Sequence, residues 1–324
     1  MIVVAQERGL GSVPFLCDRD GTPTLEARDT DARLSRILEG LADVHGCTVI
    51  AADAEHPGLD SILHDVHTDE YLTFLATLER EPLAAPVLVH PFVTPGVTPD
   101  TPVVAGMYQA ARAAACAVID AASHLTPDTP AYAACRPPGH HAGPGWLGGY
   151  CFLNNAAIAV AALRRRNHRR VAVLDIDFHF GNGTAAVLQP DEQALYLSLH
   201  CDTTQSYPYQ PVAAANERQM FHAFADPPTP AAYLAALHAA VGAVRDFGSE
   251  ALVVSIGYDI VGGDPHGGWG LEPSIFRDIA RLLRASPCPI LFVQEGGYRL
   301  DALARCSRSL AEGILDSSVP GAIH

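Results

Sequence analysis

The strongest constraint on the fold of this chain is a series of short, almost wholly apolar runs that end in polar residues. In the second half of the chain these runs are VAVLDID (171–177), ALYLSLH (194–200), ALVVSIGYD (251–259) and PILFVQEGGY (289–298). Segments in which apolar residues have helical spacing lie between them. Runs that are apolar on both faces are typical of buried parallel strands. This half of the chain therefore predicts a parallel α/β sheet whose site is built from the loops after the strands.

The first half of the chain shows the same pattern less regularly. Short apolar runs predict further strands at 1–5, 48–52 and 131–135. Residues 82–102 are rich in proline and lack periodicity, which predicts a long loop. A loop of this length inside a compact domain is usually functional or mobile. Because neither an internal repeat nor a linker interrupts the pattern, we expect residues 1–324 to form one domain.

Composition and charge exclude several classes of protein. The formal net charge is −15, so direct binding to nucleic acid phosphates is not expected. The charge would attract cationic substrates, although solubility is the simpler explanation for it. No apolar run is long enough to span a bilayer, and residues 1–10 lack the pattern of a signal peptide, so we expect a cytoplasmic protein with no membrane partner. The eight cysteines are never spaced C-x-x-C, which argues against a disulfide framework and against a structural zinc knuckle.

Two adjacent histidines stand out in the stretch RPPGHHAGPGWLGGYCFLNN (136–155). His140 and His141 lie between glycine-rich and proline-rich turns, directly after a predicted strand. Neighbouring imidazoles held in such a loop are candidates for an acid–base pair. The alternative is a surface loop that contains two histidines by chance.

Candidate metal ligands follow two of the predicted strands. Asp175 and Asp177 lie on the same side of their strand by alternation, and His179 comes two residues later. Asp264, in the turn GGDP, is a candidate third ligand. Three oxygen and nitrogen ligands with a fourth position open to water are typical of a catalytic metal and not of a structural one. The alternative is that Asp264 is an ordinary turn residue before a proline.

A tyrosine ends the last apolar run. Tyr298 follows Gly296 and Gly297, which allow a tight turn that would aim its phenol into a cleft. A phenol near a metal can donate a hydrogen bond to a polarised carbonyl, as an oxyanion-hole donor does. A tyrosine packed in the core is the alternative.

Together these motifs resemble the histone deacetylase and acetylpolyamine amidohydrolase superfamily. The matching segments, which occur in the family's order, are RPPGHHAG (136–143), GGYCFLNNAAIA (148–159), DIDFHFGNGT (175–184), LYLSLH (195–200), SIGYDIVGGDP (255–265) and QEGGY (294–298). The tract CDTTQSYPYQ and the asparagine of GNGT are more similar to the acetylpolyamine branch and the class II enzymes than to class I histone deacetylases. The resemblance implies an arginase-like α/β fold, with a parallel sheet of about eight strands between helical layers.

The resemblance also implies two metal sites. It assigns zinc to Asp177, His179 and Asp264, although ligands of these types also suit iron(II). A structural monovalent cation, usually potassium, would be held by Asp175, Ser198 and Leu199, together with backbone oxygens of the zinc-ligand segment.

The resemblance makes His140 and His141 the acid–base pair. Asp175 and Asn182 match the partners that fix the tautomer and the orientation of the two imidazoles. Tyr298 becomes the residue that polarises the acetyl carbonyl. A histidine of the pair, His141 in the reading we favour, would then deprotonate a zinc-bound water.

The expected substrate-binding residues lie on the walls and the rim of an acyl-lysine channel. They are Asp100, Gly149, Tyr150, Tyr209, His266 and Trp269. Three departures from the family pattern occur. Phe180 stands where a second histidine is usual, the segment 210–230 is short, and His266 stands where polyamine-selective relatives can carry a glutamate.

The leading hypothesis is a zinc-dependent deacetylase, a hydrolase of linear amide C–N bonds that acts on an acetylpolyamine-like small amine or on acetyl-lysine. A manganese ureohydrolase of the same fold would need extra carboxylates and would leave Tyr298 and the histidine pair unexplained. A non-catalytic acyl-ligand-binding module predicts a broken ligand set, whereas every expected position is filled. A deacetylase of a biosynthetic metabolite is a further alternative, and the oligomeric state, including a homo-oligomer, is left open.

Overall fold

The computed structural model of the chain describes residues 1–6, 15–17, 23–26, 28–80, 88–89, 91–212 and 215–316. Within these residues, eight strands form one wholly parallel sheet in the order β4-β1-β5-β10-β9-β6-β7-β8. Its strands are β1 (Ile2–Ala5), β4 (Thr48–Ala51), β5 (Ala131–Ala134), β6 (Val171–Asp175), β7 (Ala194–Cys201), β8 (Gln219–Phe224), β9 (Ala251–Ile256) and β10 (Ile290–Gln294). A separate antiparallel pair comprises β2 (Phe15–Cys17) and β3 (Pro23–Glu26).

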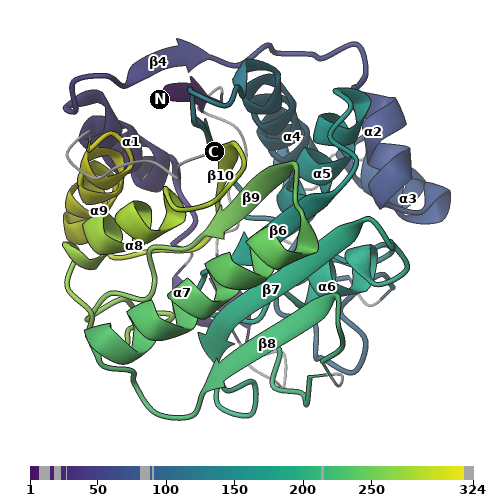
Figure 1. The fold of residues 1–324 in the computed structure, drawn as a ribbon. Helices are drawn as coiled ribbons and strands as arrows, with labels where there is room; N and C mark the ends of the chain where they lie inside the picture. Colours follow the sequence, from purple (N-terminus) through teal and green to yellow (C-terminus); the bar gives the residue numbers. More distant parts are fainter. Residues whose placement is uncertain are drawn as a thin grey trace.

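Helices cover both faces of the sheet (Figure 1). One layer comprises α2 (Leu59–Val66), α3 (Asp69–Arg80), α4 (Met107–His124), α5 (Asn155–Arg165) and α6 (Asn182–Leu188). The opposite layer comprises α1 (Asp31–Ala42), α7 (Pro230–Phe247), α8 (Ile275–Leu283) and α9 (Leu300–Ile314). None of the described helices is both long enough and apolar enough to cross a membrane.

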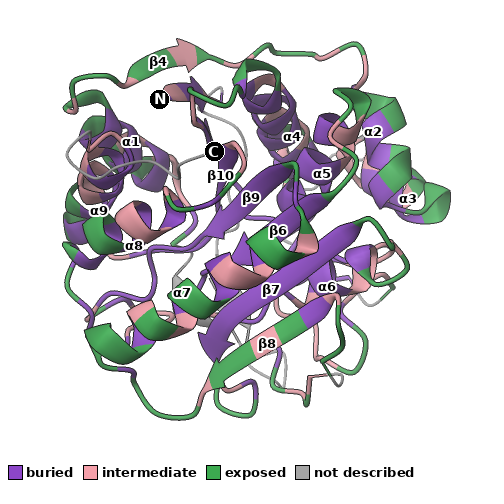
Figure 2. Cartoon of the chain, viewed as in Figure 1, coloured by how far each residue is buried: buried purple, intermediate pink, exposed green. Residues whose placement is uncertain are grey.

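Alternation along the central strands explains why both faces are covered. On β6, Val171 and Val173 contribute to the hydrophobic core on the α2–α6 side, whereas Ala172 and Leu174 contribute to the core on the other side. A strand that is apolar on both faces can be buried only between two layers of helices. Figure 2 shows the result, with buried central strands and exposed residues on the outer faces of the helices and on β8 at the sheet edge.

The predicted fold is confirmed, with one strand missed by its pattern. The seven strands predicted from apolar runs are present, and the sheet of about eight strands between helical layers is as the family resemblance implied. The pattern did not indicate β8, because QMFHAF lies at the sheet edge, where only its first residue is buried and the strand has no continuous apolar run. The described part of the predicted loop 82–102 is largely irregular, and residues 82–87 and 90 lie outside the described residues.

Strand order brings three loops together at one edge of the sheet. β9 lies between β10 and β6, and Asp175 is in register with Ser255 while Gln294 is in register with Ile256. The three strands are parallel and end at nearly the same level, so the loops after them begin side by side. Ligand sites of open parallel sheets form outside these carboxyl ends.

We predict that Leu174→Ala lowers the free energy of unfolding by roughly 2–5 kcal/mol, because a fully buried leucine of a central strand leaves a cavity. Leu300→Ala is the matched control, since this side chain is 39% exposed and its loss should change stability by less than about 0.5 kcal/mol. Urea unfolding followed by circular dichroism measures both. Equal effects of the two substitutions would contradict the core described here.

Candidate active site

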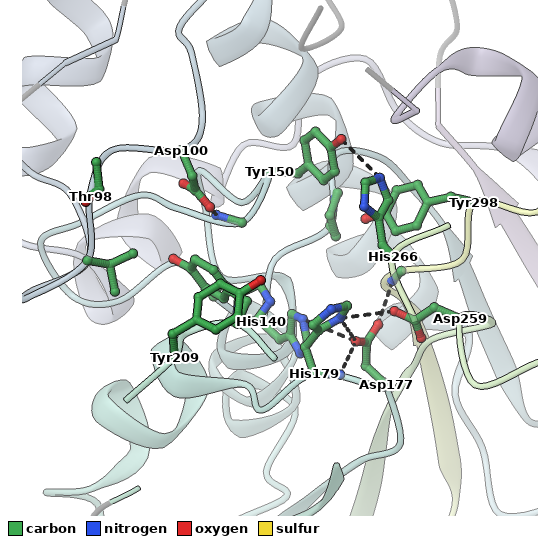
Figure 3. Close-up of a pocket in the computed structure, with 16 residues that line it drawn as sticks. Thr98, Asp100, His140, Tyr150, Asp177, His179, Tyr209, Asp259, His266 and Tyr298 are labelled. Atoms are coloured by element: carbon green, nitrogen blue, oxygen red, sulfur yellow. Dashed lines mark hydrogen bonds and ion pairs between the residues drawn. The ribbon is translucent and has the colours of Figure 1, made fainter. Parts of the chain in front are cut away.

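A cavity of about 530 Å³ lies at the carboxyl ends of the parallel strands. Ten of the residues predicted from the sequence line it, namely Asp100, His140, His141, Gly149, Tyr150, Asp177, His179, Tyr209, His266 and Tyr298. Figure 3 shows the polar groups of the floor gathered together, with Asp100 and Thr98 across the pocket from Tyr298. The structure therefore brings together side chains from loops that lie far apart in the sequence.

Three side chains on the pocket floor can hold a metal ion. They are Asp177, His179 and Asp259, and the Nδ1 atom of His179 lies 3.2 Å from Asp177 Oδ1 and 3.2 Å from Asp259 Oδ2. The other oxygen of each carboxylate is bound by the backbone, because Asp177 Oδ2 accepts from the Gly296 amide and Asp259 Oδ1 accepts from the Phe178 amide. Asp177 Oδ1 also accepts from the His179 amide at 2.9 Å, whereas Asp259 Oδ2 accepts from no backbone amide. Two buried carboxylates around one imidazole form an electron-rich donor set that fits a divalent cation.

The prediction that Asp264 is the third zinc ligand is wrong. Its Oδ1 atom accepts from the His266 amide at 3.0 Å, and its Oδ2 atom accepts from the Tyr298 amide at 2.7 Å and the Arg299 amide at 3.0 Å. Both oxygens are therefore used by the backbone, and the carboxylate ties the loop after β9 to the turn that carries Tyr298. Asp264 is not among the side chains whose donor atoms converge on the pocket floor, and Asp259 is the carboxylate that lies there with Asp177 and His179.

The position of Asp259 follows from the end of β9. The strand ends at Ile256, so Asp259 lies close to the carboxyl edge of the sheet, whereas Asp264 lies five residues further along the loop. Gly257 allows the approach, because a Cβ at this position would collide with the Asp177 carboxylate. The sequence did contain a signal for Asp259, because it is the carboxylate nearer to the strand end within the same SIGYDIVGGDP segment.

The two histidines lie side by side and have different partners. Their ring centroids are 4.0 Å apart. His140 Nδ1 lies 3.1 Å from Asp175 Oδ2, and His141 Nδ1 lies 2.8 Å from Asn182 Oδ1. A carboxylate and an amide oxygen can only accept, so each Nδ1 carries the proton of its hydrogen bond.

These different partners separate the charge states of the two imidazoles. Burial lowers the pKa of His140, but the charges of Asp177 and Asp175 outweigh burial and raise it to about 10. The pKa of His141 lies well below its usual value, first because of burial and then because of the positive charges of His140 and His179. At neutral pH the pair therefore consists of a charged His140 and a neutral His141.

A buried glutamate, which the sequence analysis did not single out, holds the loop of the histidine pair. Glu295 Oε2 accepts from the amides of Gly139 and His140 at 2.6 and 3.1 Å, and Oε1 accepts from the Ser255 hydroxyl at 2.8 Å. Burial raises the pKa of Glu295 to about 7. Its position in QEGGY, directly after β10, was the available sequence signal.

Tyr298 is fixed by a buried arginine. The guanidinium of Arg33 donates to the carbonyls of Gly297 at 2.6 Å and Glu295 at 2.5 Å, and it lies 4.4 Å from the centroid of the Tyr298 ring. Gly297 has φ +113°, a conformation that favours glycine. The ring of His266 packs edge-on against Tyr298, with centroids 4.7 Å apart. The phenol therefore has one defined position in the pocket wall.

Aromatic side chains form much of the remaining wall. Tyr150 and Tyr209 both line the pocket from left-handed backbone conformations, with φ of +69° and +57°. Conformations of this kind cost energy and cluster at functional sites. Tyr207, which the sequence analysis missed, also lines the pocket, and its ring lies 4.5 Å from that of His141. The available sequence signal for Tyr207 was its place in the YPYQ tract, two positions before Tyr209.

The prediction that Trp269 walls the channel is wrong. Its side chain is only 7% exposed and is not among the residues that line the pocket. It packs instead against Phe178, Phe224 and Tyr233, with ring centroids 4.9, 5.2 and 5.8 Å away. Trp269 thus belongs to the hydrophobic core behind the pocket floor.

The other predicted residues have the following surroundings. Asp100 lies at the pocket wall, where its carboxylate accepts from the Gly149 amide at 3.1 Å and the Thr101 hydroxyl at 2.9 Å. Ser198 is in register with Asp175, and its hydroxyl lies 2.9 Å from His200 Nδ1. Leu199, the next residue of β7, is buried. Whether a potassium ion binds there stays a prediction.

Comparison with known proteins identifies the family. Residues 28–314 match the family model described as the histone deacetylase domain. The chain belongs to this family. The acetylpolyamine amidohydrolase of Burkholderia pseudomallei (strain 1710b) is 35% identical over 276 residues, which cover 76% of this chain and 81% of that protein.

Two further comparisons agree with this assignment. Histone deacetylase 8 of Arabidopsis thaliana is 33% identical over 282 residues, covering 82% of this chain and 72% of that protein. The crystal structure of acetylpolyamine aminohydrolase from Burkholderia pseudomallei matches with a TM-score of 0.86 and 29% identity, over 97% of this chain and 98% of that one. The family that the motifs indicated is thus confirmed.

Asp259 and Asp264 should respond differently to the loss of their charge. Asp259→Asn should abolish tight binding of zinc, because it removes a charged donor atom from the pocket floor. Asp264→Asn should retain the metal but lower kcat, because an amide group facing the amides of Tyr298 and Arg299 would displace the turn. Elemental analysis after dialysis against zinc measures occupancy. Loss of metal from Asp264→Asn and not from Asp259→Asn would restore the original assignment.

Proposed function

We propose that this protein is a zinc-dependent amidohydrolase that removes the acetyl group from a small cationic amine. The observation that carries the proposal is a single pocket faced by three convergent groups that could hold a metal, a histidine pair whose pKa values are shifted in opposite directions, and the Tyr298 phenol. Each of these groups serves amide hydrolysis, and no second carboxylate cluster suited to a two-metal ureohydrolase occurs among the described residues.

Asp177, His179 and Asp259 would hold the metal. The two buried carboxylates need a cation, and Asp259 Oδ2 has no hydrogen-bond partner among the described groups beyond its 3.2 Å contact with His179 Nδ1, which supports the fit. Bound there, zinc would polarise the acetyl carbonyl and lower the pKa of a water molecule. Iron(II) suits the same donor set. A potassium ion near Asp175, Ser198 and Leu199 is part of the proposal.

His141 would act as the general base. The bond from its Nδ1–H to Asn182 leaves a lone pair on Nε2, and its lowered pKa keeps the ring neutral before the reaction. This nitrogen takes a proton from the water whose oxygen attacks the acetyl carbon. The nearby Tyr298 hydroxyl donates a hydrogen bond to the carbonyl oxygen as negative charge develops on it.

His140 would serve the other half of the reaction. Its raised pKa keeps it protonated next to Asp175, so its charge favours the anionic tetrahedral species. As the C–N bond breaks, the histidine pair delivers a proton to the leaving nitrogen. The products are acetic acid and the free amine, which exchange a proton to give acetate and the ammonium form of the amine, and the histidines return to their starting protonation states.

The pocket walls support a substrate with a flexible alkyl chain. Tyr150, Tyr207 and Tyr209 offer apolar ring faces without charge, which suit the methylene groups of an acetylated amine. Asp100 supplies a carboxylate farther from the floor (Figure 3), where it can attract a distal ammonium group. The relatives named acetylpolyamine amidohydrolases add support, while the relative named histone deacetylase 8 keeps acetyl-lysine as the second candidate.

We predict that Tyr298→Phe lowers kcat by roughly 10²–10³ with little change in KM, the usual effect of losing one oxyanion donor. Tyr132→Phe is the control, because that buried hydroxyl bonds the Tyr258 hydroxyl away from the pocket. Steady-state kinetics with metal content measured in parallel tests both. A weaker binding with unchanged kcat would show that the phenol recognises substrate and does not stabilise the transition state.

Substrate class is tested by kcat/KM for acetylputrescine, acetylspermidine and an acetyl-lysine peptide. We expect the small amines to be preferred and Asp100→Asn to reduce that preference, because the substitution removes the carboxylate that faces the distal ammonium. A tenfold preference for the peptide, which is about 1.4 kcal/mol of transition-state stabilisation, would make the protein a lysine deacetylase.

A further inference from the structure

We infer that Tyr196 is a positioning residue for the histidine pair, which it serves through Asp175 and through the backbone before Asn182. Tyr196 lies on β7, is fully buried and does not line the pocket. The expected effect on turnover rests on the proposed function. The contacts of Tyr196 do not depend on it.

The hydroxyl of Tyr196 touches the same carboxylate oxygen that orients His140. It lies 3.0 Å from Asp175 Oδ2, and that oxygen lies 3.1 Å from His140 Nδ1. The other oxygen, Oδ1, accepts from the Asp177 amide at 3.1 Å. Since Asp175 is fully buried, no water can replace a lost donor, and a buried carboxylate is stable only when such donors surround it.

The same hydroxyl also contacts the segment that orients His141. It lies 3.1 Å from the carbonyl oxygen of Gly181, the residue directly before Asn182. Asn182 begins α6, and its amide oxygen receives the Nδ1–H of His141. One phenol from the neighbouring strand therefore fixes the partners of both imidazoles relative to each other.

The absence of a side chain at Gly181 leaves room for this hydroxyl. A Cβ at this position would collide with both Asp175 Oδ2 and the Tyr196 hydroxyl. The phenol ring itself is held by its neighbours, because its centroid lies 6.1 Å from that of Phe221 and 6.4 Å from that of Phe180. Removing the hydroxyl alone should therefore leave the ring in place and free the carboxylate to turn.

The test is Tyr196→Phe in the metal-loaded enzyme. We expect kcat to fall about 10- to 100-fold, the usual loss when a residue behind a reacting group is removed, with KM and metal content near those of the wild type. The melting temperature should fall modestly, because a buried carboxylate loses one hydrogen-bond donor. Tyr233→Phe is the matched control, because Tyr233 is equally buried and its hydroxyl has no hydrogen-bond partner among the described residues. That variant should retain wild-type kcat.

A second readout does not depend on turnover. In protein with ¹⁵N-labelled histidine, the hydrogen-bonded Nδ1–H proton of His140 should resonate far downfield and should shift or exchange faster in Tyr196→Phe but not in Tyr233→Phe. If the wild type hydrolyses none of the acetylated amines or peptides, the proposed function fails while this signal still tests the positioning. An unchanged signal together with wild-type kcat would overturn the inference.

The monovalent cation expected near Asp175 gives one further outcome. Kinetics of Tyr196→Phe are compared at low and high potassium chloride, with sodium chloride holding the ionic strength constant. The inference expects the loss of kcat to persist at both concentrations. Recovery of wild-type kcat at high potassium would show that the hydroxyl acts through the cation, and the inference would fail.

Discussion

Four buried carboxylates within one site are the constraint on which the rest of this structure depends. Asp175, Asp177, Asp259 and Glu295 all lie at the carboxyl ends of neighbouring strands and have no exposure to solvent. An unpaired charge in such a place costs several kcal/mol, so each must be met by donors or by a cation. Backbone amides meet both oxygens of Asp177 and one of Asp259, and the histidines and the proposed metal would neutralise the charge that remains.

The same constraint links the two halves of the proposed chemistry. The side chain of Glu295 holds the loop of the histidine pair, while its backbone carbonyl accepts from Arg33, which also lies against the Tyr298 ring. Asp29 pairs with Arg33 at 2.6 Å, so that this guanidinium is itself compensated. The proposed general base and the proposed oxyanion donor are thus positioned by one continuous set of buried charges, and a shift in either loop would be resisted by the other.

The positions of residues that directly follow a strand could be predicted from the sequence. The positions of side chains within the long loops could not. His179 and the histidine pair were predicted correctly to lie at the carboxyl ends of the parallel strands. The strands are in register, so residues that follow different strands lie close together in space. Asp264 and Trp269 lie in the long loop after β9, where nothing in the sequence shows which side chain turns inward. β8 was missed because an edge strand has no continuous apolar run, and Tyr207 because nothing in YPYQ distinguishes its two tyrosines.

The uneven distribution of charge within the pocket places the proposed substrate selectivity at its outer wall. Negative charge is concentrated at the floor, where the histidines and the proposed metal neutralise it. His266 beside Tyr298 adds no charge, since its pKa is lowered to about 3, first by burial and then by the charges of His179, Arg28 and Arg33. The net charge of −15 is screened beyond about 8 Å, so it cannot select a substrate inside the pocket. Asp100 is the remaining carboxylate among the described lining residues, and under the proposed function it would discriminate between cationic and neutral chains.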